Sequence, residues 1–359
     1  MPIFERQDFA RVVVSAISAA RYVRTAGATG EPLFWARSPA DLDREVLLWS
    51  EILAASGVRR GMRGVVALPN QDMAQAVARG SEIHGGAMAV VADFDLAAAF
   101  EGLKPDVLIT SPLTAFRLHL RNRLKDLGVL LLTADVGGFG PLREFFAACY
   151  PDLSMREVYA LTEHAGPLAL GCEAGNLHWV SDGVAVELIH PGRGEDARPG
   201  EVASVVLTDL GERAMPLWRY NTGDLVRVAS GPCRCGADSV VLSSGILGRL
   251  ARTRAISQRV VFPADVAAVI YSVPGLTDRF KAVVRADPEM GRDLLEVTVA
   301  LLPGLDQAVA KRLVRERVLD RTGLVVNVNI VPPAAVEPVL QVFAQELRSR
   351  VPDPVRWLS

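Results

Sequence analysis

Two stretches of the chain carry residue types that can hold a phosphorylated ligand. Residues 24–32 (RTAGATGEP) are small and glycine-rich, and such a loop can wrap phosphate oxygens with its backbone N–H groups. The hydroxyls of Thr25 and Thr29, beside Gly30, would add hydrogen bonds. Residues 159–163 (YALTE) end an apolar strand pattern, where a hydroxyl and a carboxylate can hold phosphate and Mg²⁺. Each stretch taken alone also fits an ordinary turn.

Two further stretches carry charged residues that suit a ribose. Residues 214–224 (AMPLWRYNTGD) deliver Asp224 on a glycine turn, where its carboxylate can accept hydrogen bonds from both ribose hydroxyls. Residues 246–249 (ILGR) bring Arg249 within reach of a ribose or a phosphate. The alternatives are a hairpin turn that uses Gly-Asp for its geometry and a surface arginine on a linker.

Three cysteines and one histidine have the spacing of a metal site. Five residues separate Cys172 from His178, and one residue separates Cys233 from Cys235 in a tight polar turn. Three thiolates and one imidazole suit tetrahedral Zn²⁺, so we expect a structural zinc that ties two β segments together. Unrelated thiols and a surface histidine are the alternative. Cys149 lies in an apolar helical pattern and is expected to pack in the core.

The composition indicates a two-domain protein without a polyanionic or membrane partner. The chain has 359 residues, 50% of them hydrophobic, and a formal net charge of −2. No block of like charges points to a nucleic acid, and no apolar run reaches the roughly 20 residues of a membrane helix. The first residues lack a signal-peptide pattern, so we expect a cytoplasmic protein. Its four cysteines then favour metal or thiol chemistry over disulfides.

The first half alternates helical and strand patterns, which predicts a parallel sheet flanked by helices. The expected helices cover residues 41–56, 73–84, 95–103 and 141–150. The expected strands cover residues 64–68, 87–92, 107–110, 129–133 and 157–159.

The second half has a different pattern. Strands of a more antiparallel kind are expected at residues 185–189 and 201–207, between Gly- and Pro-rich turns. The elements expected after residue 249 are a helix at 263–272, strands at 282–285 and 294–301, a helix at 306–321 and a strand at 325–331. This αββαβ order predicts a small open α+β sandwich. We therefore expect two domains, residues 1–248 and 249–359, with a hinge near residues 248–254.

In this order, the four stretches resemble the signature of the phenylacetate–CoA ligase and coenzyme F390 synthetase group of adenylate-forming enzymes. The resemblance extends from about residue 20 to about residue 330 and includes residues 261–263 (VFP) and 272–275 (SVPG). It implies an α/β fold, with a mostly parallel sheet plus a β-rich subdomain in a large N-terminal domain, and a small α+β C-terminal domain. It also implies a shortened N-terminal domain, whose exposed surface a partner or a homodimer mate would cover.

The resemblance further implies a role for each site residue. The residues implied to contact the ATP phosphates are Thr25, Thr29, Gly30 and Thr162. Tyr159 would lie against the adenine and Glu163 would bind Mg²⁺. The residues implied to hold the ribose are Asp224 and Arg249. The family also has similar residues at the expected zinc ligands.

The implied reaction is attack of a small-molecule carboxylic acid on the α-phosphorus of ATP, which gives an acyl-adenylate and pyrophosphate. A thiol, usually that of CoA, then displaces AMP, with a carrier protein or an amine as the other possible acceptors. Catalysis would come from positioning and charge neutralisation, with Thr162, Glu163 and Arg249 as the catalytic residues. Two other functions stay open. One is a degenerate homologue that binds a nucleotide or acyl ligand without turnover, and the other is a transferase or condensing enzyme that uses a preformed acyl-adenylate or thioester.

Several positions depart from the family pattern. In the phosphate loop, Ala26 and Ala28 lack hydroxyls, and Glu31 stands where the family has lysine. A carboxylate there would repel a triphosphate unless it turned away. At the hinge, Ala251 and Arg252 stand where the family has carboxylates. These departures keep the two other functions open.

The C-terminal part departs as well. Gln258 aligns near the family glycine that lets the pantetheine arm pass, and no lysine follows Lys311. The family uses a lysine close to the C-terminus in adenylation. The basic residues that this tail offers instead are Arg348, Arg350 and Arg356. His164 is expected to be hydrogen-bonded in the core, with an acyl pocket or a zinc ligand as the alternatives.

Overall fold

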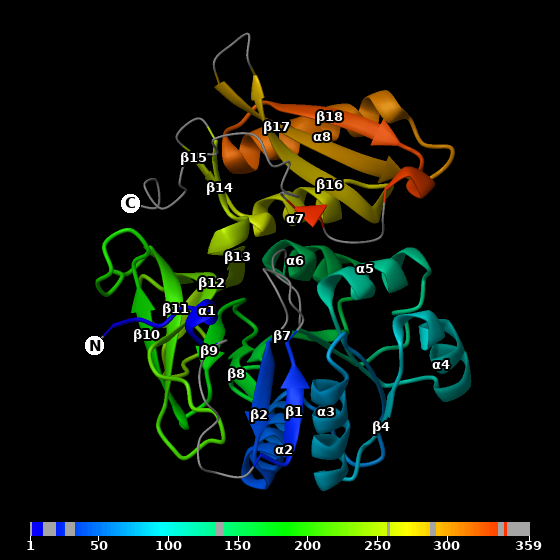
Figure 1. The fold of residues 1–359 in the computed structure, drawn as a ribbon. Coiled ribbons are helices and arrows are strands. Elements are labelled where there is room, and N and C mark those ends of the chain that lie inside the picture. Colours follow the sequence, from blue (N-terminus) through cyan, green and yellow to red (C-terminus); the bar gives the residue numbers. More distant parts are fainter. Residues whose placement is uncertain are drawn as a thin grey trace.

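A mixed sheet of 11 strands forms the larger part of the molecule, and a four-stranded sheet forms the smaller part above it in Figure 1. The structure is a computed structural model and describes residues 2–9, 19–25, 33–133, 139–256, 259–287, 292–336 and 341–342. Within these ranges, no helix has the length and apolar character needed to cross a membrane. The prediction of a mixed α/β fold is confirmed.

The parallel half of the large sheet is built from short buried strands. In sheet order they are β7 (Ser154–Leu161), β6 (Val129–Leu132), β5 (Val107–Thr110), β3 (Arg63–Ala67) and β4 (Ala87–Val90). Every residue of β5 and β6 is buried, which explains why their sequences are almost continuously apolar. All four neighbouring pairs are parallel, as predicted.

Helices connect these strands, and three of them begin at a polar side-chain cap. They are α2 (Pro39–Ala55), α3 (Gln71–Ile83), α4 (Leu96–Leu103), α5 (Pro112–Leu120) and α6 (Phe139–Cys149), with a short 3-10 turn, η1 (Asp93–Asp95), before α4. Ser38, Asn70 and Ser111 cap α2, α3 and α5 by accepting backbone N–H groups of the first turn. The sequence patterns predict no helix at α5.

The antiparallel half continues the same sheet. Its strands are β8 (Gly166–Gly171), β9 (Leu177–Trp179), β10 (Val184–Ile189), β11 (Val202–Asp209), β12 (Tyr220–Val228) and β13 (Val241–Arg249). β7 is the junction, because it pairs in parallel with β6 and antiparallel with β8. Loops that follow β7 therefore lie where the two kinds of pairing meet.

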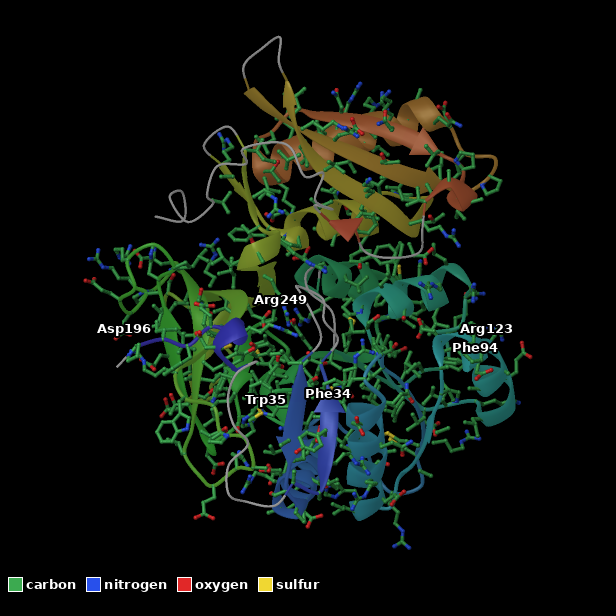
Figure 2. All side chains as sticks on the ribbon, in the orientation of Figure 1. Phe34, Trp35, Phe94, Arg123, Asp196 and Arg249 are labelled. Atoms are coloured by element: carbon green, nitrogen blue, oxygen red, sulfur yellow. The ribbon has the colours of Figure 1, made fainter. Side chains whose placement is uncertain are left out.

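An N-terminal hairpin lies against the large sheet. It consists of β1 (Arg21–Arg24) and β2 (Phe34–Arg37), and a short helix, α1 (Arg6–Phe9), precedes it. Trp35 is fully buried, whereas Phe34 is exposed (Figure 2), as expected for neighbours on a strand. Ala36 and Arg37 are buried as well, and Val23, Trp35 and Ala36 pack in one apolar cluster with residues of the antiparallel strands.

The small part has the predicted αββαβ order. Its helices are α7 (Pro263–Ser272) and α8 (Gln307–Thr322), and its sheet order is β18 (Val326–Val331), β17 (Arg292–Leu301), β16 (Leu276–Asp287) and β19 (Gln341–Val342). Before α7 come a 3-10 turn, η2 (Leu250–Arg252), and a hairpin of β14 (Arg254–Ile256) and β15 (Arg259–Val261); η3 (Pro333–Ala335) follows β18.

The two parts share one apolar core. Phe116 of α5 and Tyr271 of α7 have ring centroids 4.9 Å apart. Beside them, Nε of Arg117 donates to the carboxylate of Asp278 on β16 at 2.8 Å. The division into domains at residues 248 and 249 remains a proposal. Strand β13 ends at Arg249, and η2 begins directly after it.

Candidate functional site

The turn between β7 and β8 carries Thr162 and Glu163 at the junction of the large sheet. Ala165 has a φ of 66°, a left-handed conformation that lets the chain reverse within a few residues. The hydroxyl of Thr162 accepts a hydrogen bond from the Asn70 amide at 2.9 Å, and its carbonyl accepts one from the guanidinium of Arg37. The turn is therefore fixed from two sides, by α3 and by β2.

Asp224 lies in a buried network with two predicted site residues. Its carboxylate accepts hydrogen bonds from the hydroxyl of Tyr159 at 2.9 Å and from Nε of Arg249 at 3.0 Å. The register explains this contact, because Asp224 of β12 lies directly opposite Arg249 of β13. Arg249 lies at the end of β13, close to the small part of the molecule (Figure 2).

Burial and the neighbouring charges both shift the pKa values of the side chains in this network. Burial raises the pKa of Asp224, although Arg249 opposes the shift. The carboxylate of Asp224 raises the pKa of Arg249 further above its ordinary value. Burial raises the pKa of Tyr159 well above its ordinary value, so this phenol stays protonated and donates to the carboxylate.

Glu163 holds a second buried carboxylate beside the first. Its Oε1 accepts a hydrogen bond from the hydroxyl of Tyr220 at 3.2 Å and lies 3.8 Å from Nη1 of Arg6. Burial and the Glu163 charge both raise the pKa of Tyr220. The charge of Glu163 also raises the pKa of Arg249, so the two carboxylates belong to one electrostatic cluster. We call Tyr159, Glu163, Tyr220, Asp224 and Arg249 the polar cluster.

The start of the predicted phosphate loop reaches the polar cluster. The buried hydroxyl of Thr25 accepts hydrogen bonds from the backbone N–H of Leu33 at 2.9 Å and from Nη2 of Arg6 at 2.8 Å. The other loop positions singled out from the sequence, Thr29, Gly30, Ala26, Ala28 and Glu31, lie outside the described residues, as do Gln258, Arg348, Arg350 and Arg356.

Sequence patterns did not point to several polar residues of this region. Arg6, Asn70 and Tyr220 contact predicted site residues, and only Tyr220 stands inside one of the four stretches. Asn70 follows Pro69 at the end of an apolar strand pattern, which is the place where a helix cap and a loop side chain are both expected. Nothing in the sequence around Arg6 signals a site.

Glu157 is a further buried carboxyl on β7, two residues before Tyr159 and therefore on the same face of the strand. Its Oε1 accepts the backbone N–H of Ile246 at 3.5 Å, and its Oε2 has no hydrogen-bond partner. Burial raises the pKa of Glu157 to about 8. Any Cβ at Gly245 would lie 2.2 Å from Oε2, so β13 needs a glycine to pass over this carboxyl.

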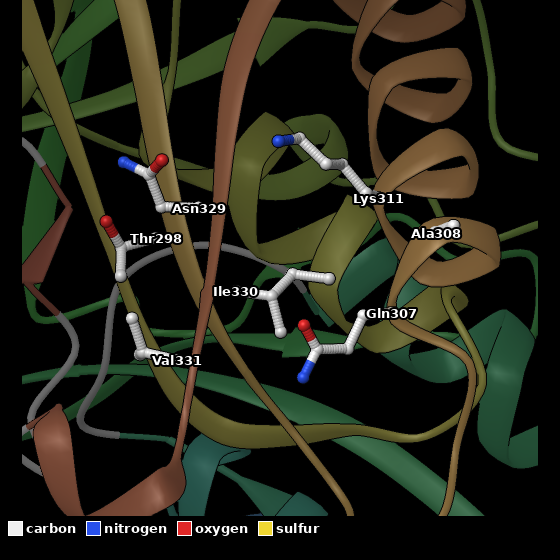
Figure 3. Close-up of a pocket in the computed structure, with 7 residues that line it drawn as sticks. All are labelled: Thr298, Gln307, Ala308, Lys311, Asn329, Ile330 and Val331. Carbon is white, nitrogen blue, oxygen red and sulfur yellow. The ribbon is translucent and has the colours of Figure 1, made fainter.

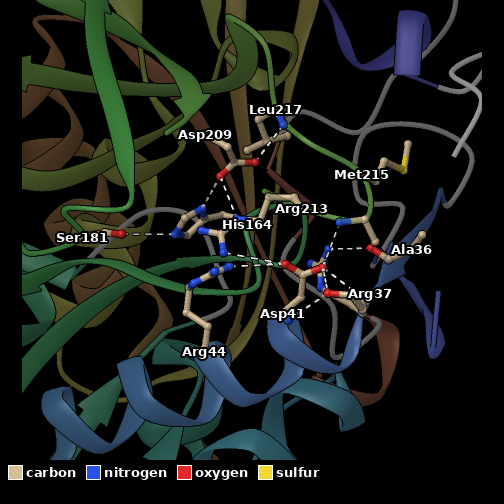
Figure 4. Close-up of polar contacts among 12 residues, drawn as sticks. Ala36, Arg37, Asp41, Arg44, His164, Ser181, Asp209, Arg213, Met215 and Leu217 are labelled. Atoms are coloured by element: carbon tan, nitrogen blue, oxygen red, sulfur yellow. Dashed lines mark hydrogen bonds and ion pairs between the residues drawn. The ribbon is translucent and has the colours of Figure 1, made fainter. Parts of the chain in front are cut away.

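His164 belongs to a separate buried network, drawn in Figure 4. Its Nδ1 lies 3.3 Å from the carboxylate of Asp209, and its Nε2 lies 3.3 Å from the Ser181 hydroxyl. Arg213 joins Asp209 to Asp41, the residue that completes the cap of α2. The expectation of a hydrogen-bonded core histidine is confirmed, and the network anchors the β7–β8 turn to α2.

The four predicted metal ligands converge, although they come from three separate segments of the chain. Cys172 follows β8, His178 lies in β9, and Cys233 and Cys235 lie between β12 and β13. The ligand atoms of Cys172, His178, Cys233 and Cys235 all lie within 4.8 Å of one another. The sulfurs of Cys172 and Cys233 are 3.6 Å apart, and the sulfur of Cys235 is 3.2 Å from Nε2 of His178. Hydrogen bonds from the backbone at Cys235 and from the Asn176 amide lower the pKa of the Cys233 thiol to about 6.

Cys149 corrects one prediction, because it is exposed rather than packed in the core. Leu142 and Phe146 form the buried face of α6, and Cys149 is the last residue of that helix. This thiol therefore has no part in the metal-ligand set.

Lys311 also lies away from the polar cluster. It lines a hollow of about 560 Å³ between α8 and the strands β17 and β18 (Figure 3). The lining residues are Thr298, Gln307, Ala308, Lys311, Asn329, Ile330 and Val331. None of them belongs to the polar cluster.

Comparison with known proteins points in the same direction as the motifs. No protein-family model matches the chain. The phenylacetate-coenzyme A ligase of Thermus thermophilus is 27% identical over 365 residues, which span 92% of this chain and 80% of that protein. The chain is similar to the phenylacetate-coenzyme A ligases over most of its length. A second ligase of that name, from Aromatoleum evansii, is 26% identical over 70% of this chain and 59% of its own length.

Solved structures of CoA ligases share the fold of this chain. A 2-hydroxyisobutyryl-CoA ligase in its postadenylation state matches with a TM-score of 0.79 at 18% identity, over 98% of this chain and 80% of that one. The same ligase in its thioesterification state, at 18% identity over 98% and 79% of the two chains, gives a TM-score of 0.61.

Proposed function

We propose that the chain activates a carboxylic acid with ATP through an acyl-adenylate and transfers the acyl group to CoA. The observation that carries this proposal is the convergence of Tyr159, Glu163, Asp224 and Arg249, from three different strands and one turn, in a single buried cluster. The similarity to phenylacetate-coenzyme A ligases over 92% of the chain supports it.

The residues of the cluster have the chemistry that a nucleotide requires. The Asp224 carboxylate, beside Arg249, can accept both ribose hydroxyls, and Tyr159 offers an aromatic face for the adenine. The hydroxyl of Thr162 would donate to the α-phosphate. Thr25, with Thr29 and Gly30, would hold the remaining phosphates.

The reaction proceeds in two balanced steps. A carboxylate oxygen of the substrate attacks the α-phosphorus of ATP, and the bond to pyrophosphate breaks. The sulfur of CoA then attacks the acyl carbon, its proton leaves, and the bond to AMP breaks. Both steps require the protein to position charged groups and to stabilise negative charge on phosphate oxygens, which is the work of Thr162 and Arg249.

Mg²⁺ fits at Glu163, since Mg²⁺ is commonly held by one or two carboxylates together with substrate phosphates, and it would neutralise phosphate charge there. A structural zinc fits the four Cys and His ligands. Sulfur and nitrogen ligands on a tetrahedral zinc are roughly 3.6–3.8 Å apart. The 3.6 Å between the sulfurs of Cys172 and Cys233 agrees with this, and the 3.2 Å between Cys235 and His178 is somewhat shorter. The Ser239 hydroxyl, 3.1 Å from Nδ1 of His178, would fix the imidazole.

The remaining partners follow from the same reaction. We expect the protein in the cytoplasm, where ATP and CoA are available, as a homodimer. A carrier-protein thiol or an amine is the alternative acceptor. No nucleic-acid partner is expected at a formal net charge of −2.

One observation favours a second candidate, a homologue that binds nucleotide without forming an adenylate. Glu31 stands in the phosphate loop where the family resemblance implies lysine, and Lys311 lines a separate hollow in the small part. An enzyme that uses a preformed acyl-adenylate or thioester would need the same nucleotide-binding residues of the polar cluster.

Acid-dependent exchange of labelled pyrophosphate into ATP separates these functions. We expect exchange with at least one acid from a panel of aromatic acids, and its loss in Glu163→Ala but not in Glu82→Ala, an exposed residue of α3. ATP binding without exchange would favour the binding protein. Release of AMP from a supplied acyl-adenylate and CoA, without exchange, would favour the transferase.

A further inference from the structure

The N-terminal segment completes the edge of β12 beside the polar cluster. Phe4 forms a parallel bridge with Tyr220: its N–H donates to the Arg219 carbonyl, and its carbonyl accepts the N–H of Asn221, both at 2.9 Å. β13 pairs with β12 only from Asp224 onward, so Phe4 occupies the part of the edge that β13 leaves open. In Figure 1, α1 accordingly lies next to β12.

This docking carries Arg6 into the site. Nη2 of Arg6 donates to the Thr25 hydroxyl at 2.8 Å, and Nη1 lies 3.8 Å from Oε1 of Glu163. The side chain of Arg6 is only 21% exposed. Its guanidinium therefore lies between Thr25 of the phosphate loop and the carboxylate proposed for Mg²⁺.

We propose that Arg6 is a catalytic residue of the adenylation step, whose guanidinium contacts the phosphates of ATP. This inference rests on the proposed function. The planar guanidinium has five N–H donors in a fixed fork, so it can keep its hydrogen bond to Thr25 and still donate to phosphate oxygens. A cation here also offsets the repulsion between the Glu163 carboxylate and a triphosphate.

The position suits the charge that develops during reaction. As the carboxylate attacks and pyrophosphate leaves, negative charge builds on the phosphate oxygens, and a fixed cation stabilises it without moving a proton. Adenylation in this chain then takes a cation from the N-terminal segment, where Arg6 lies beside Glu163.

The first experiment compares Arg6→Gln, Arg6→Lys and a matched control, Arg21→Gln. Arg21 is an exposed arginine of β1 that pairs with Asp72. We expect Arg6→Gln to lower kcat for pyrophosphate exchange about 100-fold, as losing one preorganised donor does. Arg6→Lys should restore part of that loss, and the control should match the wild type. Equal kcat in Arg6→Gln and wild type would overturn the catalytic role of Arg6 and leave the proposed function standing.

The second experiment uses binding, so it does not depend on turnover. Calorimetry with ATP and with AMP should show Arg6→Gln weakening ATP more than AMP, because the guanidinium acts on phosphates that AMP lacks. Equal weakening of both nucleotides would contradict the phosphate contact. A wild type that binds ATP through Arg6 but shows no exchange would refute the proposed function and the catalytic role, while the phosphate contact would stand.

The third experiment tests the docking itself. Phe4→Pro removes the N–H that donates to Arg219, so it should release the segment and lower kcat as Arg6→Gln does. The double variant should be no slower than Arg6→Gln alone, because both changes remove the same group. Losses that multiply in the double variant would contradict this route, and unchanged thermal unfolding of Arg6→Gln would exclude a loss of folding as the cause.

Discussion

The polar cluster and the Cys/His cluster are both assembled from distant segments, but their charges are balanced in opposite ways. Glu163 and Asp224 face the guanidiniums of Arg6 and Arg249 and the hydroxyls of two tyrosines. In the Cys/His cluster, three thiols and an imidazole crowd within 4.8 Å, and thiolates at that distance repel one another. The first site is balanced by side chains of the protein itself, whereas we propose that a bound cation balances the second.

Removing the metal should therefore have the largest effect. We expect about one equivalent of zinc in the protein purified without chelator, and its loss in Cys233→Ser, with a fall in Tm of roughly 10 °C or more. Elemental analysis and thermal unfolding check this, and Cys149→Ser, at an exposed thiol, is the matched control. A wild type that contains no metal and has the same Tm as Cys233→Ser would remove the contrast between the two clusters.

Glu157 gives a test of intermediate size, because it is a buried carboxyl near the polar cluster without the compensation that Asp224 has. Its folded pKa of about 8 lies above its ordinary value of 4.5, so the folded protein binds the proton more tightly. The corresponding stability is complete below pH 4.5 and is lost as the pH rises through 8.

We expect Glu157→Gln to remove this pH dependence, which amounts to a few kcal/mol at about 1.4 kcal/mol per pH unit. Urea unfolding at pH 5.5, 7 and 8.5 measures it, with Glu82→Gln as an exposed control. If the variant and the wild type lost stability in parallel over this range, the Glu157 carboxyl would not be the source of the pH dependence.

The smallest effect is expected at Asp224, where the protein supplies its own partners. Asp224→Asn should weaken ATP and AMP alike, by roughly 1.5–3 kcal/mol, through lost charged hydrogen bonds to the ribose. Calorimetry measures this, and Asp126→Asn, at an exposed aspartate, is the control. Unchanged affinity would argue against the ribose role, and weakening of ATP alone would place Asp224 at the phosphates.

Much of the fold was accessible from the sequence, because apolar periodicity and turn residues report local structure directly. The buried strands β5 and β6 and the order of the small part were predicted, and α5 was not. Its sequence carries a capping serine and a proline at the first turn, which are local helix-start signals that the apolar periodicity alone does not register. The roles assigned to Tyr159, Thr162 and Asp224 stay predictions, although the structure joins Tyr159 and Asp224 by a hydrogen bond.

By itself, the sequence determined which residue types were available and which short segments they occupied: a hydroxyl beside a carboxylate after a strand, an aspartate on a glycine turn, and three thiols with a histidine. Only the tertiary structure decided that Phe4 pairs with Tyr220 and thereby carries Arg6 to Glu163, and that Oε2 of Glu157 lies without a hydrogen-bond partner beneath Gly245. The physical reason is range. Hydrogen bonds and apolar periods within a helix or strand act over a few residues, whereas burial and charge balance depend on groups that meet only after the whole chain has packed.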